Sequence, residues 1–148
     1  MPNILALYFS TFGHIAAMTH AAAVGARDLG ATVTVKKVAD FRTTDQPDPE
    51  SRSAILGDEI ADPRELENYD GFIVGVSTRF GIINAPLKHF FDQTFPLWAR
   101  GVLIDKPVTI MSSAANQHGG LEAAILSTQA MLQHHGMLIV PLSYSYAE

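Results

Sequence analysis

Residues that could bind an anion follow the first apolar run of the chain. That run is Asn3–Phe9, and the segment after it reads Ser10, Thr11, Phe12, Gly13, His14 and Ile15. A strand that ends at the start of a helix presents unpaired backbone N–H groups and the positive end of the helix dipole, which together attract a phosphate. The two hydroxyls add donors, and Gly13 permits a tight turn.

The kind of phosphate follows from what this segment lacks. It has no lysine of the kind that a P-loop directs at a triphosphate, and it lacks the glycines of a dinucleotide fingerprint. A terminal monophosphate therefore fits it better than either. The alternative is an ordinary turn between a strand and a helix, in which Ser10 or Thr11 caps the helix.

Two later segments could meet a flat ring. They follow the apolar runs Gly71–Ser77 and Pro107–Ser112, and in order their residues are Thr78, Arg79, Phe80 and Gly81, then Ser113, Ala114, Ala115, Asn116, Gln117, His118 and Gly119. The first combines a hydroxyl, a guanidinium and an aromatic ring, and the small residues of the second permit close approach. Each could instead be a plain surface loop. With the phosphate segment they indicate a mononucleotide with a flat head group, a description that FMN fits.

The elements that would carry these segments alternate along the chain. Apolar or β-branched runs predict strands at Asn3–Phe9, Thr32–Val38, Gly71–Ser77, Pro107–Ser112 and Met137–Leu142. Helical patterns are expected at His14–Leu29, Asn84–Trp98 and Gly120–His135, with a helical turn at Pro63–Tyr69 and a short helix at Ser51–Leu56 inside a long polar segment.

This alternation predicts an α/β fold. Parallel strands joined by right-handed helical crossovers produce it, and five strands fit a doubly wound parallel sheet in the flavodoxin-like order 2-1-3-4-5. Residues 1–148 would form this single domain. Ligands bind such sheets beyond the carboxyl ends of the strands, so we expect the three segments to meet at one edge.

Composition narrows the class of protein. Of 148 residues, 47% are hydrophobic and 17% are charged, which is typical of a globular protein, and a formal net charge of -5 disfavours a nucleic-acid partner. The absence of cysteine excludes disulfides, thiolate catalysis and iron–sulfur clusters. No apolar run is long enough for a membrane span and no signal peptide is recognised, so we expect a cytoplasmic protein. The histidine spacings form no metal-ligand pair, and we expect no metal.

Segments along nearly the whole chain resemble one family, the WrbA-type NAD(P)H:quinone oxidoreductases of the flavodoxin-like superfamily. The resemblance rests on LYFSTFGHI near the start, STRFG at Ser77–Gly81, FFDQTFPLWARG at Phe90–Gly101, the pair Ser112-Ser113 with GG downstream, and HHGMLIVPLSY at His134–Tyr144. It implies FMN as cofactor, NAD(P)H as co-substrate, a quinone as substrate, and a homo-oligomer built as a dimer of dimers.

The resemblance also implies roles for particular residues. The segment Ser10–Ile15 would hold the phosphate of FMN, while Thr78, Arg79, Phe80 and the stretch from Ser113 to His118 would face the isoalloxazine ring. His134 matches a position at the flavin and could donate a proton near neutral pH. As an alternative, His134 could simply close a helix, where a cation interacts well with the dipole.

Two aromatic residues match substrate positions of that family. Phe12 matches an aromatic residue near bound nicotinamide, and Trp98 matches the tryptophan that lines the quinone site and reaches a neighbouring subunit. The residues alone favour a core position for Trp98, at the end of an amphipathic helix.

The chain departs from the family in two places. Its third segment reads AANQH where the family is richer in glycine, and the sequence stops at Glu148, where the family continues with a Gly-rich segment and a final helix. We therefore expect the final helix to be absent, with effects on FMN affinity and tetramer formation.

The expected reaction is a transfer of two electrons from NAD(P)H to quinones by a ping-pong hydride mechanism on FMN. The alternatives are a flavodoxin-type one-electron carrier and a non-enzymatic regulatory or assembly module.

Overall fold

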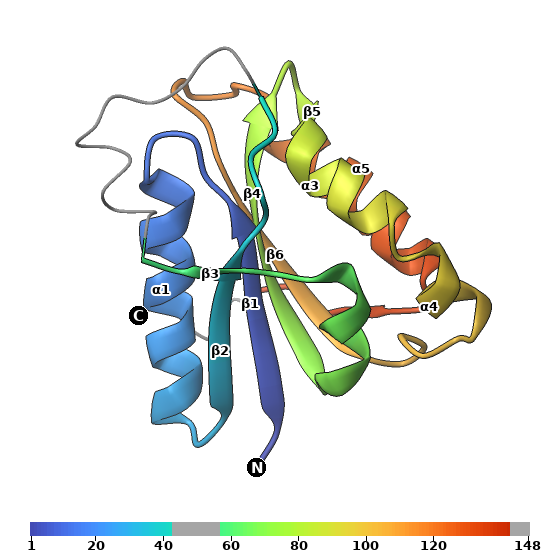
Figure 1. Ribbon diagram of the computed structural model, residues 1–148. Helices are drawn as coiled ribbons and strands as arrows, with labels where there is room; N and C mark the ends of the chain where they lie inside the picture. Colours follow the sequence, from blue (N-terminus) through green and yellow to red (C-terminus); the bar gives the residue numbers. More distant parts are fainter. Residues whose placement is uncertain (43–56, 143–148) are drawn as a thin grey trace.

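The computed structural model of the chain describes residues 1–42 and 57–142, and at its centre lies a mostly parallel β-sheet (Figure 1). The sheet contains seven strands among these residues, in the order β3-β2-β1-β4-β6-β7, with β5 paired to β4. Their bounds are Asn3–Phe9 (β1), Thr32–Lys37 (β2), Glu59–Ile60 (β3), Gly71–Arg79 (β4), Ile82–Ile83 (β5), Pro107–Ser113 (β6) and Leu138–Ile139 (β7).

The α/β class and the parallel sheet are confirmed, but the expected count of five strands is wrong. The five expected strands are neighbours in the order β2-β1-β4-β6-β7, and β3 and β5 are additional. Each of these has only two residues, which is too short to produce a periodic pattern. β5 runs antiparallel to β4, so the two form a hairpin at the carboxyl end of β4.

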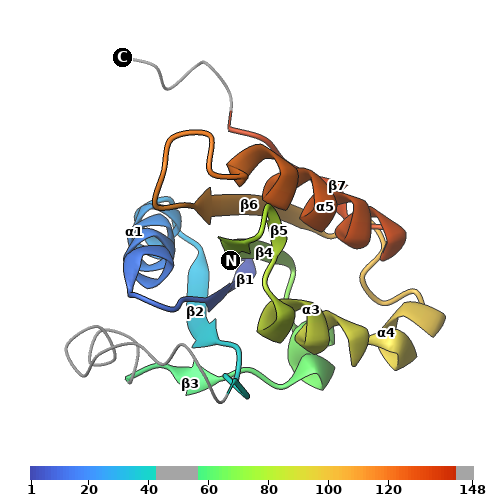
Figure 2. The ribbon, with the colours of Figure 1, turned by 90° about the horizontal axis from the view of Figure 1, so that it is seen from above.

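Helices cover both faces of the sheet (Figure 2). Their bounds are His14–Asp28 (α1), Ala85–Asp92 (α3), Phe95–Ala99 (α4) and Leu121–His134 (α5), with a 3-10 helix at Pro63–Asn68 (η1). α1 packs against the face that carries Ala6 and Tyr8, whereas α3, α4 and α5 pack against the opposite face. No helix in the described part of the chain is both long and apolar enough to cross a membrane.

The expectation of one helix over Asn84–Trp98 is wrong, because the segment forms α3 and α4 with a break between them. Pro96 lies in the first turn of α4, where a proline is accepted, but it has no N–H to continue the hydrogen bonding of α3. The hydroxyl of Thr94 supplies a donor at the end of α3 instead, since it donates to the carbonyl oxygen of Phe91 at 2.6 Å. The short helix expected at Ser51–Leu56 lies outside the described residues.

A glycine in β4 sets how closely α1 approaches the sheet. A Cβ on Gly75 would lie 2.5 Å from the Oγ1 atom of Thr19 and 2.7 Å from the Cγ2 atom of Ile15. Real Cβ atoms do not come this close to other atoms, so only glycine permits the observed packing. The first turn of α1 is thereby held next to the carboxyl end of β1.

Candidate functional site

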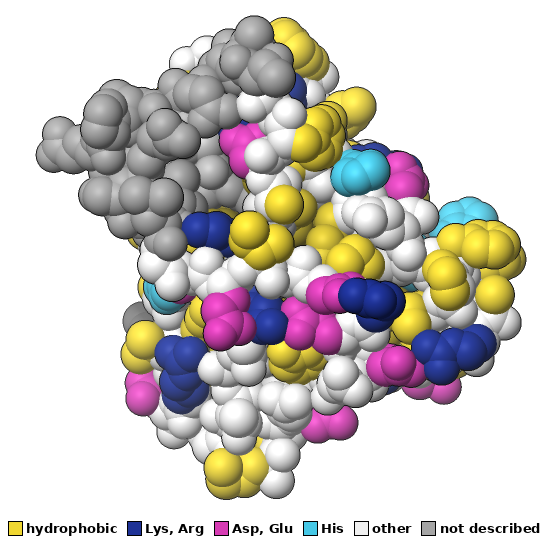
Figure 3. Space-filling view, viewed as in Figure 1, with side chains coloured by type: hydrophobic (Ala, Val, Ile, Leu, Met, Phe, Trp, Pro, Cys, Tyr) yellow, Lys and Arg dark blue, Asp and Glu magenta, His cyan; other side chains and the backbone are white. Residues whose placement is uncertain are grey.

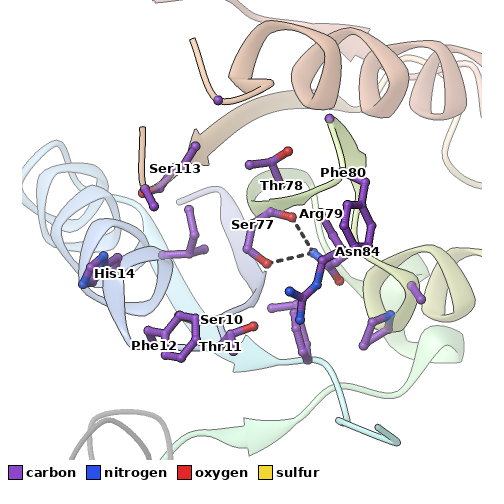
Figure 4. A pocket seen from close by; sticks show the side chains of 18 of the residues that line it. Ser10, Thr11, Phe12, His14, Ser77, Thr78, Arg79, Phe80, Asn84 and Ser113 are labelled. Atoms are coloured by element: carbon purple, nitrogen blue, oxygen red, sulfur yellow. Dashed lines mark hydrogen bonds between the residues drawn. The ribbon is translucent and has the colours of Figure 1, made fainter. Parts of the chain in front are cut away.

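A cavity of about 450 Å³ opens at the carboxyl ends of β1, β4 and β6. Its size is that of a small-molecule site. The three predicted segments meet there, and the predicted residues that line it are Ser10, Thr11, Phe12, His14, Ile15, Thr78, Arg79, Phe80, Gly81, Ser113, Ala114, Ala115, Asn116 and Gly119. Figure 4 shows Ser10, Thr11 and Phe12 across the cavity from Thr78 and Phe80, with Ser113 from β6 on a third side.

The first segment forms a turn that leads directly into α1. Ser10 is buried, and its hydroxyl oxygen accepts a hydrogen bond of 3.1 Å from the backbone N–H of Gly13. Gly13 is the N-cap of α1 and has a φ of 88°, in the left-handed region that favours glycine. The alternative in which Ser10 or Thr11 caps the helix is therefore wrong: no side chain caps α1.

The hairpin between β4 and β5 forms the opposite wall. Its turn residues, Phe80 and Gly81, have φ values of 53° and 83°, the combination that a tight two-residue hairpin requires. Phe80 is 97% exposed. The hydroxyl oxygen of Thr78 is buried and has no hydrogen-bond partner within the described structure. A buried hydroxyl of this kind indicates a place for a polar atom of a ligand.

The third segment leads into α5, and the residue at the start of this helix packs against the hairpin between β4 and β5. A Cβ on Gly120 would lie 2.6 Å from the Cα atom of Gly81 and 3.3 Å from the Oγ1 atom of Thr78. Gly120 also has a φ of 88°. Contact between the start of α5 and the hairpin therefore depends on a glycine at this position. Gln117 and His118 do not line the cavity.

Sequence reasoning did not predict Asn84, which joins two walls of the site. It is 4% exposed, and its side-chain amide donates to the carbonyl oxygen of Ser77 at 3.1 Å and to the Ser77 hydroxyl at 3.2 Å (Figure 4). Its Oδ1 atom accepts from the backbone N–H of Leu87 at 2.9 Å and so caps α3. Asn84 thus fixes the end of β4 against the start of α3. The pattern Asn-Ala-Pro is a helix-start signal that could have revealed the cap.

Arg42 was also not predicted. It lines the cavity, and its guanidinium carbon lies 4.8 Å from the centre of the Phe9 ring. The guanidinium donates to the carboxylate of Asp40. Among the lining residues that the structure describes, Arg42 and Arg79 are cationic and none is Asp or Glu. Asp40, which is paired with Arg42, offsets part of this positive charge.

The surface over β3 and η1 differs from the cavity in its charge. Figure 3 shows acidic and basic side chains side by side there, and Lys36 pairs with Glu65 at 2.8 Å and with Glu59 at 3.4 Å. The hydrogen bond from Lys36 to Glu65 raises the pKa of Lys36 above its usual value. These groups neutralise one another, so this face does not present a single sign of charge to a ligand.

Trp98 and His134 lie together but outside the cavity. The indole of Trp98 is stacked on the ring of Phe95, with 5.5 Å between the ring centres. α5 begins beside the hairpin and runs for 14 residues to His134, which is about 20 Å along the helix axis. The structure therefore separates these two predicted site residues from the cavity of their own chain. No group of three possible metal ligands occurs within residues 1–42 and 57–142.

Comparisons with known proteins agree with this geometry. Over residues 2–148 the sequence matches the family described as NADPH-dependent FMN reductase. A curated relative from Chelativorans sp. (strain BNC1), named NAD(P)H dehydrogenase (quinone), is 54% identical over 99% of this chain and 73% of its own length. A protein of the same name from Brucella anthropi is 47% identical over the same shares of the two chains, 99% and 73%.

Solved structures identify the fold. A flavodoxin, WrbA-like protein from Agrobacterium tumefaciens superposes with a TM-score of 0.70 at 23% identity and covers 97% of this chain and 80% of that one. Oxidised Flavodoxin 1 from Bacillus cereus superposes with a TM-score of 0.66 at 19% identity, over 95% of this chain and 80% of that one. At these identities the likeness shows the fold alone, and that fold is flavodoxin-like.

Proposed function

The chain belongs to the NADPH-dependent FMN reductase family, and we infer that it is an FMN-dependent oxidoreductase that oxidises NAD(P)H and reduces quinones. One observation assigns this function to a site: the three segments meet in one cavity of about 450 Å³ at the carboxyl ends of the strands. Those ends are where ligands bind in doubly wound folds.

The residues at this edge fit FMN. Ser10, Thr11 and the N-terminus of α1 hold its phosphate, because the helix end supplies N–H groups and a favourable dipole. The hairpin at Thr78–Gly81 and the residues Ser113–Asn116 would hold the isoalloxazine ring. The buried hydroxyl of Thr78, which has no partner in the described structure, supports this placement of a polar ring edge.

Bound FMN would supply the redox chemistry, a two-electron transfer from NAD(P)H to a quinone. The protein binds and orients the reactants. Phe12 lines the cavity and is 59% exposed, so its ring is available to stack on a flat substrate at the opening. Because donor and acceptor use the same opening, they bind one after the other, and the kinetics are ping-pong.

The subfamily is the WrbA type, and the assembly is a dimer of dimers in which Trp98 and His134 act in the cavity of a neighbouring chain. Their exposure supports this proposal: Trp98 is 47% exposed, its stacking partner Phe95 is 65% exposed, and His134 is also exposed. In that cavity Trp98 lines the quinone site, and His134 is placed to hold or move a proton near neutral pH.

The test begins with purified protein and FMN. We expect saturable binding of one FMN per chain, measured by the quenching of flavin fluorescence. The same sample should then oxidise NADPH or NADH with benzoquinone as acceptor, and double-reciprocal plots at several quinone concentrations should give parallel lines. A folded chain that does not bind FMN would contradict the assignment of the cavity. Intersecting lines would contradict the shared opening.

A further inference from the structure

We propose that His135 is a positioning residue for the quinone, because its imidazole ring holds the start of α4 and so fixes Trp98 at the surface. This inference rests on the proposed function, since it concerns the residue that would line the quinone site of a neighbouring chain. It assigns separate roles to the two adjacent histidines at the end of α5, of which only His134 was predicted to act in the reaction.

Trp98 is half-exposed, yet contacts hold it at several points. Its ring is stacked on that of Phe95 with 30° between the two planes, and its indole N–H is bonded to the main chain of α5. Its backbone N–H donates to the carbonyl oxygen of Thr94 at 3.0 Å. The orientation of Trp98 therefore depends on the position of Thr94.

α4 has only five residues, so it depends on its surroundings. Isolated helices shorter than about 12 residues are marginally stable in water. Thr94 is the N-cap of α4, but its side chain makes no capping hydrogen bond to this helix, although threonine commonly does so. Thr94 is fully buried, and its hydroxyl contacts α3 and the end of α5 instead. Neighbouring elements therefore hold the start of α4.

The ring of His135 makes the contact from α5. Its Nε2 atom lies 2.7 Å from the Oγ1 atom of Thr94, and its Nδ1 atom lies 3.0 Å from the carbonyl oxygen of Met131, one turn earlier in the helix. A carbonyl oxygen only accepts, so Nδ1 carries a proton and ties the ring to its own helix. The edge of the ring also packs against Phe91, with 6.1 Å between the ring centres. These contacts direct Nε2 at Thr94.

The bond between His135 and Thr94 can form in either charge state of the ring. With a proton on both nitrogens, Nε2 donates to the Thr94 hydroxyl, which donates to the carbonyl oxygen of Phe91 at 2.6 Å. With a proton on Nδ1 alone, the Thr94 hydroxyl donates to Nε2, and the Phe91 oxygen keeps the backbone N–H of Thr94 at 3.0 Å. Both states therefore join α5 to the start of α4.

The two histidines thus hold two parts of the same residue. The main chain of His134 fixes the indole of Trp98, and the side chain of His135 fixes its backbone through Thr94. Stacking of flat rings requires a particular geometry, and a misplaced reactant loses rate. Loss of the His135 contact should therefore impair the use of quinone even though Trp98 is present.

The experiment compares wild type with His135→Phe, which keeps a ring beside Phe91 and loses both nitrogens. We expect the KM for benzoquinone to rise by about fivefold, because Trp98 is misplaced, while the dissociation constant for FMN and the KM for NADPH stay the same. Thr94→Val removes the same bond from the other side and should have the same effect. Thr94→Ser keeps the hydroxyl and should behave as wild type.

A Trp98→Ala background shows whether His135 acts through Trp98. In that background His135→Phe should raise the KM for benzoquinone no further, because two residues that act through one contact are not additive. A further rise would indicate a general structural effect and would contradict the inference.

Trp98 is the only tryptophan of the 148 residues, so its fluorescence reports its position directly. At a concentration at which the two proteins sediment alike, acrylamide should quench His135→Phe about twofold more strongly than wild type, because the half-exposed indole loses its packing. His89→Phe is the matched control. His89 lies on α3, is exposed, contacts Phe41 and does not line the cavity. Its substitution should change neither the quenching nor the KM.

The outcomes are distinct. If His135→Phe and Thr94→Val fold and keep the wild-type quenching and the wild-type KM for benzoquinone, the inference is overturned while the proposed function stands. Stronger quenching without a rise in the KM would also overturn it, since His135 would then hold Trp98 without serving the quinone. If folded wild type binds no FMN, the proposed function and the inference are both overturned.

Discussion

The indole N–H of Trp98 donates a hydrogen bond of 2.8 Å to the main-chain carbonyl oxygen of His134. The bond ties α4 to the last residue of α5, so two residues with predicted roles in the reaction are joined at one surface. Neither lines the cavity of its own chain. The roles proposed for them would therefore require contact between chains, and this requirement can be measured.

Substitution of Trp98 by alanine should impair the use of quinone rather than the binding of flavin. The loss of an aromatic stacking partner should raise the KM for benzoquinone by about tenfold, with the dissociation constant for FMN unchanged. The activity of wild type per bound flavin should fall on dilution, in parallel with dissociation of the oligomer in analytical ultracentrifugation. Leu29→Ala, at a residue that is 90% exposed at the end of α1, is the control for lost apolar surface. An unchanged KM for Trp98→Ala would exclude Trp98 from the quinone site.

Substitutions of Asn84 should separate helix capping from the support of the hairpin. Asn84→Ser keeps an oxygen that can cap α3 but loses the amide donors to Ser77, so it should keep most of the thermal stability and bind FMN more weakly. Asn84→Ala loses both functions and should also lower the free energy of unfolding by about 1–2 kcal/mol. Thermal unfolding and FMN titration measure the two effects. Equal FMN affinity in wild type and Asn84→Ser would mean that the amide does not position the site.

Gly120→Ala should weaken FMN binding because it displaces the hairpin. The added Cβ would meet the Cα atom of Gly81, which is backbone and cannot turn away. Gly30→Ala is a matched control, since Gly30 has a φ of 90° against 88° at Gly120 but has no atom within 4 Å of the added Cβ. Both variants carry the strain of a left-handed alanine, roughly 1 kcal/mol. Only Gly120→Ala should raise the dissociation constant for FMN, and equal effects of the two variants would contradict this explanation.

Tyr8→Phe should change how stability depends on alkaline pH. Burial, and then the hydrogen bond of 2.7 Å to Asp58, raise the pKa of Tyr8 well above its usual value of 10.0. Above pH 10 the unfolded chain releases the Tyr8 proton while the folded chain keeps it, so this group makes the folded state less stable as pH rises. The Phe variant lacks this contribution.

The free energies of unfolding of wild type and Tyr8→Phe can be compared by denaturant titration between pH 7 and pH 11. We expect wild type to be more stable by about 1–2 kcal/mol at neutral pH, from the bond to a charged acceptor. The difference should then narrow above pH 10. His20 contacts the same Asp58 oxygen at 2.8 Å, and the substitution of Tyr8 does not remove either member of that pair. A difference that stays constant with pH would contradict the raised pKa.

The sequence predicted the central strands well because burial on both faces leaves a continuous apolar run. β1 is found at Asn3–Phe9, as expected. β4 extends to Arg79, two residues beyond the expected Ser77, because β5 pairs with its end. That pairing and the break between α3 and α4 depend on local backbone geometry, which hydrophobic periodicity does not encode.

The meeting of the three segments could be predicted because topology alone decides it. Segments after neighbouring parallel strands must meet at one edge, and they do. Arg42 could not be predicted, since its place at the cavity depends on packing against Phe9. The separation of His134 from the cavity was missed, although the predicted helix at Gly120–His135 already implied it, since α5 runs for 14 residues from the third segment to His134. Trp98 shares this separation because its indole bonds to His134.

The close approach of α1 to β4 at Gly75 matters for the redesign of this protein. Gly75 does not line the cavity, yet any larger residue there would press against Ile15, which packs on the glycine and lines the cavity. This contact would move the phosphate segment relative to a hairpin that Asn84 holds in place. We therefore expect substitutions at position 75 to change flavin affinity. A mutant library restricted to the residues that line the cavity would omit this position.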